Sequence, residues 1–203
     1  MTRITGLTGA TLETAPTVCH DCVWWQSRRG RVDKRRWIEK AEDEWGAWGT
    51  VYYDDDGRLL GSMQYGPSDL FPRAAELPAG PPSDDAVLVT CAYLTDPSRP
   101  WVMQSLFLTA IGDSREKGAR ALEAFAYRYP ESDRGVDRFR MHKTIFPSDF
   151  LADFGFMTLR SQGRVELARL ELGGLVPVAE GRRERVLRVV RDAFLPAPAP
   201  QRP

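Results

Sequence analysis

AVLVTCAYLTD, the run from Ala86 to Asp96, reads as a β-strand because apolar and β-branched residues dominate it. The strand ends at Asp96 and Pro97, and the residues up to Gly118 have the composition and spacing of a helix. A strand that passes through a short loop into a helix forms a corner where amide groups of the first helical turn are free to bind an anion. We therefore predict an anion site at this corner, of the kind that binds diphosphates.

Length and charge restrict the remaining possibilities. The 203 residues suit one ordinary domain, and a hydrophobic content of 42% is sufficient for a packed core. The 28 lysines and arginines balance the 28 aspartates and glutamates, so no cationic field indicates nucleic-acid binding, and a small molecule or a protein is the expected partner. No apolar run is long enough to span a bilayer and no secretory signal is visible, so we expect no membrane partner and a cytoplasmic location.

Cysteine usage indicates a reducing compartment, since three cysteines are an odd number in a chain too long to need disulfides. Cys19 and Cys22 have the spacing of half a zinc site, but outside this cluster the sequence offers only Cys91 and His142 as further ligands of these types. We therefore predict no metal site. Cys22 and its neighbours Val23, Trp24 and Trp25 are expected to face the core. Metal or redox chemistry at the cysteine pair is the weaker alternative.

Caps and turns divide the rest of the chain into short elements. Asp33 is suited to capping a helix, Gly46 to ending it, and Gly57 to a tight hairpin turn. The segment up to Pro16 is expected to be a loosely held arm or an edge strand. The predicted elements are helices at 33–46 and 147–155, strands at 48–53, 58–66, 119–129, 156–161 and 164–172, and a basic C-terminal helix at 180–194.

These elements predict an α/β fold with a mixed, mostly antiparallel sheet flanked by helices on both faces. We assign residues 1–178 to one domain and 179–203 to the C-terminal helix and a disordered, proline-rich tail. Residues 67–83 contain five prolines and are expected to form an ordered loop over the sheet, walling a binding site. The charged segment 131–140 is expected to be an exposed loop.

The order of elements resembles that of the GNAT superfamily of acyl-CoA-dependent N-acyltransferases, in which a helix ending in Gly-Phe, here Gly155 and Phe156, leads into the last strands. Further motifs are similar to an actinobacterial branch of that superfamily. They are Cys19-x-x-Cys22 followed by Val23-Trp24-Trp25, Ser83-x-Asp85-Ala86-Val87-Leu88, Ala121-Leu122-Glu123-Ala124-Phe125, and Leu151-x-x-Phe154-Gly155-Phe156.

The resemblance implies an enzyme that transfers an acetyl group from the cosubstrate acetyl-CoA to a primary amine, either a protein lysine or a small metabolite. It implies that the backbone of Ala92, Tyr93 and Leu94 pairs with the pantetheine arm. The diphosphate would lie at the start of the following helix, against Arg99, Trp101, Val102, Met103 and Gln104. The sequence leaves the acceptor unidentified and the oligomeric state open between a monomer and a homodimer.

The sequence departs from the superfamily pattern in two features. Ser98, Trp101 and Met103 stand where the phosphate loop usually has small residues, and bulky side chains there hinder the approach of a diphosphate. Leu151 stands where many relatives have a tyrosine that protonates the departing thiolate, although water, Tyr93 or Tyr127 could replace it. The alternative is therefore a non-catalytic member of the same fold, which acts as a binding or regulatory module through its basic helix at 182–191.

Glu123 is the first candidate for the general base, because a carboxylate in the middle of a strand has little structural reason to be there unless it faces a cleft. The alternative is a solvated residue on an open sheet face. His142 is the second candidate, with a suitable intrinsic pKa. Asp84 and Asp85 precede the central strand, where they could attract a cationic amine or simply form a turn.

Overall fold

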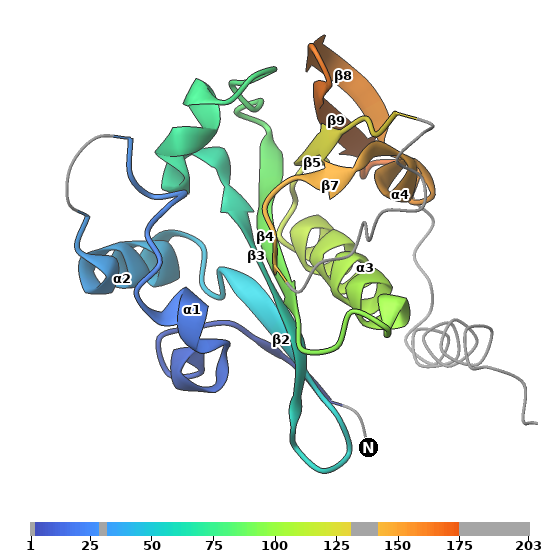
Figure 1. Cartoon of the computed structure of the whole chain (residues 1–203). Coiled ribbons are helices and arrows are strands. Elements are labelled where there is room, and N and C mark those ends of the chain that lie inside the picture. Colours follow the sequence, from blue (N-terminus) through green and yellow to red (C-terminus); the bar gives the residue numbers. More distant parts are fainter. Residues whose placement is uncertain (1–2, 29–31, 131–141, 175–203) are drawn as a thin grey trace, which may run out of the picture.

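The computed structural model describes residues 3–28, 32–130 and 142–174, which form a twisted sheet with helices on both faces (Figure 1). The strand order is β1-β2-β3-β4-β5-β9-β8, with β6 attached to β4 and β7 to β5. The strands are β1 (Arg3–Gly6), β2 (Gly49–Tyr53), β3 (Leu59–Pro67), β4 (Ala86–Leu94), β5 (Ala121–Tyr127), β6 (His142–Lys143), β7 (Phe146–Pro147), β8 (Met157–Gln162) and β9 (Val165–Glu171). Only the β4–β5 and β5–β7 pairs are parallel among the pairs described, which confirms the predicted mixed, mostly antiparallel α/β fold.

The helices separate into two groups by the face of the sheet that they cover (Figure 1). Helices α1 (Thr17–His20) and α2 (Lys34–Glu44) lie on one face, while α3 (Pro100–Glu116) and α4 (Ser148–Ala152) lie on the other. Short 3-10 turns at Leu12–Thr14, Ser68–Leu70 and Pro72–Glu76 complete the described elements. None of the helices in the described ranges has the length and apolar character required to cross a membrane.

Alternation along the central strands creates one hydrophobic core on each face. Val87 and Val89 of β4 pack in the core beneath α3, whereas Leu88 between them packs in the core beneath α2. In β5, Leu122 and Ala124 likewise face α3, as the alternation of apolar residues predicted. The central strands β4 and β5 are therefore buried on both sides.

The residues predicted to begin and end helices have these roles in the structure. The side chain of Asp33 accepts hydrogen bonds from the backbone N–H of Arg35 at 2.9 Å and of Arg36 at 3.3 Å, which caps α2. Gly118 ends α3 with a φ of +80°, a backbone conformation that residues with a Cβ rarely adopt. The start of α2 and the end of α3 are thus each set by a single residue.

Two predictions for irregular segments are confirmed, and one described helix was not predicted. The N-terminal arm is an edge strand, since β1 pairs with β2, and the short helix α1 was not predicted. The loop at 67–83 is ordered, partly as 3-10 turns. The predicted helix at 180–194, the tail, and the charged loop at 131–140 lie outside the described residues.

Candidate functional site

A bulge in β4 separates this strand from β5. In the pairing of β3 with β4, Gln64 lies opposite Cys91 and Tyr65 opposite Val89, which leaves Thr90 as the extra residue. Bulges of this kind bend a strand and increase its twist. The parallel pairing of β4 with β5 ends at the same point, at Val89 and Ala124. Beyond the bulge the two strands have different partners.

Residues 142–147 supply those partners. β6 pairs antiparallel with β4, with His142 opposite Tyr93 and Lys143 opposite Ala92. β7 pairs parallel with β5, with Phe146 opposite Ala126. The other edge of β4 is taken by β3. The edge of Ala92 and Tyr93 that was predicted to bind the pantetheine arm therefore faces β6, and that role, together with the role of Leu94, stays a prediction.

The corner between β4 and α3 satisfies most of its own hydrogen-bonding groups. The Asp96 carboxylate accepts from the backbone N–H of Ser98 at 2.9 Å, from the Ser98 hydroxyl at 2.6 Å and from Arg99 Nε at 3.1 Å. The N–H of Arg99 and of Val102 donate to carbonyls within the corner, and Pro100 has no N–H. The hydrogen bonds from Ser98 lower the pKa of Asp96. An ionised carboxylate therefore lies where an anion site was predicted, which weakens that site.

The bulky residues at the start of α3 pack against the sheet. The ring of Trp101 contacts that of Tyr52 edge to face, with centroids 5.7 Å apart. Val102 and Met103 are fully buried in the core beneath α3. Gln104 is partly buried, and its Oε1 has no hydrogen-bond partner within the described part of the chain. Contact of these four residues with a cofactor stays a prediction. Because the side chains of Val102 and Met103 are buried, only their backbone groups could make such a contact.

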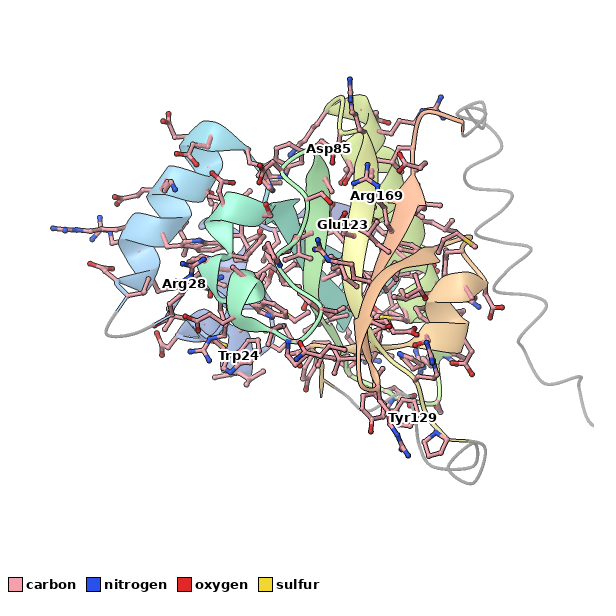
Figure 2. All side chains as sticks on the ribbon, turned by 90° about the horizontal axis from the view of Figure 1, so that it is seen from above. Trp24, Arg28, Asp85, Glu123, Tyr129 and Arg169 are labelled. Atoms are coloured by element: carbon pink, nitrogen blue, oxygen red, sulfur yellow. The ribbon has the colours of Figure 1, made fainter. Side chains whose placement is uncertain are left out.

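Glu123 is the member of the predicted site whose surroundings differ most from the expectation. Its side chain has no exposed area. One carboxylate oxygen accepts from the N–H of Ser83 at 2.9 Å and the other from Arg169 Nη1 at 3.0 Å. Arg169 also binds Asp85 and Glu171, and Figure 2 shows Asp85, Glu123 and Arg169 lying together. Neither the cleft-facing nor the solvated interpretation of Glu123 is correct, because it belongs to a buried ion pair.

The two candidate bases are therefore not equivalent in position. Glu123 lies opposite Leu88, where β4 and β5 are still paired. The backbone of His142 lies opposite Tyr93, beyond the bulge. A basic role for either residue stays a prediction. Leu151, at the position expected for a tyrosine, is fully buried.

A cavity of about 350 Å³ lies on the opposite face of the sheet, under α1 and the start of α2. Cys19, Cys22 and Cys91 line it together with Lys34, Trp25 and Trp48. Burial raises the pKa of the Cys19 thiol to about 11 and that of Cys91 to about 12. No group of histidines, cysteines and carboxylates able to hold a metal occurs among the described residues.

Sequence reasoning missed this cavity. Of the residues expected in the core beside Cys22, Trp25 is buried, but Trp24 is 38% exposed, which corrects that expectation for Trp24. The available signal was the cluster of cysteines and tryptophans at 19–25, which a packing interpretation also explained. Only the fold brings Lys34 and Cys91 to the same space.

No protein-family model and no curated protein matches the chain. Solved structures of acetyltransferases do resemble it. An N-acetyltransferase from Staphylococcus aureus has a TM-score of 0.49 and 13% identity, over 85% of this chain and 99% of that one. A GCN5-related N-acetyltransferase from Kribbella flavida has a TM-score of 0.47 and 14% identity, over 84% and 98%. The GNAT domain of S. lividans PAT has a TM-score of 0.47 and 15% identity, over 84% and 90%.

The strand order, the parallel β4–β5 pair and the position of α3 directly after β4 define the class of this chain as a mixed, mostly antiparallel α/β fold. At these identities the likeness concerns the fold alone. A function for the chain consequently depends on the geometry of its site.

Proposed function

We propose that the chain binds acetyl-CoA beside β4 and transfers its acetyl group to a primary amine, either a protein lysine or a small-molecule amine. The supporting observation is the bulge at Thr90, where β4 parts from β5. Beyond it, the side of Ala92, Tyr93 and Leu94 that faces away from β3 meets the two-residue strand β6, which lies opposite Ala92 and Tyr93. A strand edge supplies the alternating donors and acceptors that the amides of a pantetheine arm require.

Acetyl-CoA, when bound, supplies the activated acyl group, and the chain supplies position and proton transfer. Main-chain N–H groups beyond the bulge would stabilise the negative charge that develops on the thioester oxygen. The attacking amine must first lose a proton, and the imidazole of His142 has an intrinsic pKa suited to accepting it. Since Leu151 has no proton to give, water would protonate the departing thiolate.

This function requires β6 to separate from β4, so that the pantetheine arm can pair with β4 instead. β6 contributes only two residues to the pairing with β4. Each hydrogen bond that is lost costs about 1 kcal/mol net. The amides of pantetheine could replace those bonds on the same edge, so the exchange is energetically modest.

The second candidate is a non-catalytic protein of the same fold. Three observations favour it: β6 occupies the edge of β4, the corner before α3 satisfies its own amides, and the Trp101 ring packs against Tyr52. Such a protein would use the fold for binding or regulation without acyl transfer.

Calorimetric titration with acetyl-CoA distinguishes the two functions. We expect saturable binding and a rise in melting temperature, because a ligand that binds only the native state stabilises it. Release of coenzyme A thiol in the presence of a panel of primary amines then reports transfer. His142→Ala should retain binding and lose amine-dependent release, while Lys143→Ala, its neighbour in β6, serves as the matched control. Absence of heat and of stabilisation at millimolar acetyl-CoA would contradict the transferase and support the second candidate.

A further inference from the structure

The cavity beneath α1 has an apolar lining with few polar groups. Its volume is about 350 Å³, within the range of small-molecule sites. Trp24, Trp25 and Trp48 contribute large aromatic surfaces, and β4 contributes Cys91 and Ala92 to its floor. Because burial keeps the thiols of Cys19 and Cys91 protonated near neutral pH, these side chains add apolar surface rather than nucleophiles.

Lys34 is the charged residue of the lining. Its Nζ donates to the carbonyl of Cys22 at 2.9 Å and lies 4.6 Å from the ring centroid of Trp37 and 5.2 Å from that of Trp48. An ammonium group has three protons to donate, so the carbonyl does not exhaust its capacity. Among the described residues that line the cavity there is no carboxylate. Burial lowers the pKa of Lys34, because desolvation disfavours the charged form.

Two residues of the lining also carry an indole N–H that is enclosed by protein. Trp25 and Trp48 are 2% and 1% exposed, and neither indole N–H has a hydrogen-bond partner within the described ranges. A buried donor without an acceptor costs about 1–3 kcal/mol. The Gln64 side-chain oxygen, an acceptor in this lining, already receives the Thr90 hydroxyl at 2.9 Å and Gln26 Nε2 at 3.5 Å. This acceptor oxygen is therefore already occupied.

We propose that this cavity binds a small apolar molecule that carries a carboxylate, with the carboxylate beside Lys34 and the apolar part against the tryptophans. The carboxylate supplies acceptor oxygens for the remaining protons of the half-buried Lys34 ammonium, and a carboxylate paired with an ammonium forms a charge-assisted hydrogen bond. A cationic amine is disfavoured because it would meet the like charge of Lys34. The site is thus distinct in its chemistry from a site for a primary amine, and it holds whether or not the chain transfers acetyl groups.

Three probes of similar shape and different charge test the proposal by calorimetry. They are phenylacetate, 2-phenylethylamine and 2-phenylethanol. We expect saturable binding of phenylacetate, weaker binding of the alcohol and none of the amine at the same concentration. The proposal is overturned if the amine binds as tightly as phenylacetate, or if phenylacetate does not bind at millimolar concentration. Acetyl-CoA is absent from these titrations, so their failure is separate from failure of the transferase proposal.

Substitution of Lys34 tests whether phenylacetate binds in this cavity. Lys34→Met should weaken phenylacetate by at least about tenfold, equivalent to about 1.4 kcal/mol, and leave 2-phenylethanol unchanged. The matched control is Lys40→Met, on the same helix, where the lysine is exposed and paired with Glu44 at 3.6 Å. An unchanged affinity of Lys34→Met for phenylacetate overturns the proposal. Should that variant not fold, Lys34→Gln is measured by the same criterion.

Discussion

Arg169 and Glu123 face each other directly across β9 and β5, with 3.0 Å between Nη1 and Oε1. The same guanidinium binds Asp85 at 2.9 Å and Glu171 at 2.6 Å. The second oxygen of Glu123 accepts from the N–H of Ser83. This cluster therefore joins the chain entering β4 to β5 and β9. Hydrogen bonds from Arg169 lower the pKa of Asp85, and those from the carboxylates raise the pKa of Arg169.

Loss of the Glu123 carboxylate should therefore reduce stability. Glu123→Ala leaves the Ser83 N–H without its acceptor and removes the buried partner of Arg169, so we expect a loss of about 3 kcal/mol in the free energy of unfolding. Glu123→Gln keeps an acceptor oxygen and should lose about half as much, since only the charge is removed. Urea unfolding measures both variants.

The control for this prediction is Glu171→Gln, which removes a carboxylate from the same arginine at an exposed position. Its side chain is 68% exposed, so a change below about 1 kcal/mol is expected. A Glu123→Ala variant as stable as the native protein would contradict the structural role of the pair. Any effect of Glu123→Gln on acetyl transfer should then follow its effect on stability.

Alkaline pH should destabilise the protein through its buried thiols. Burial raises the pKa of Cys91 from 9.0 to about 12, so between these values the unfolded state has lost a proton that the folded state retains. Unfolding therefore becomes more favourable as pH rises above 9. We expect Cys91→Ala to lose less stability than the native protein between about pH 8 and pH 10, measured by urea unfolding at both values. Equal losses in the two proteins would show that the Cys91 thiol does not contribute.

The cap of α2 should influence both stability and the cavity. The Asp33 side chain accepts hydrogen bonds from two backbone N–H groups of α2, and Asp33 directly precedes Lys34. Asp33→Ala should cost about 1 kcal/mol of stability, whereas Asp33→Asn should cost less because it retains the acceptor oxygen. Because the first turn positions Lys34, we also expect Asp33→Ala to weaken phenylacetate binding and Asp33→Asn to preserve it. Calorimetry of both variants provides the comparison.

Most of the fold could be predicted from the sequence, because the relevant signals are local. Asp33, Gly57 and Gly118 set element ends through capping and backbone conformation, and the apolar alternation around Leu122 set the faces of β5. The short strands β6 and β7 gave no signal, since two residues carry no periodicity. Their pairing depends on which edge the bulge in β4 leaves open.

The candidate site was less predictable because its properties depend on contacts between distant residues. Glu123 has no recognisable partner in the sequence, since Arg169 is 46 positions away in the chain. The anion site at the start of α3 was inferred from helix geometry, but Asp96 and the corner carbonyls take several of the amides. Sequence shows which groups a segment has, and the fold determines which of them remain available.

Competition between β6 and a pantetheine arm predicts a variant with increased cofactor affinity. Lys143→Pro removes a backbone N–H and restricts φ, so it should weaken the pairing of β6 with Ala92 and Tyr93. If acetyl-CoA must replace that pairing, its affinity should rise by up to about tenfold, the equivalent of one or two ladder hydrogen bonds. Lys143→Ala keeps the N–H and should leave the affinity unchanged. Calorimetry on the native protein and both variants gives the answer, and equal affinities in all three would show that β6 and the cofactor do not share the edge of β4.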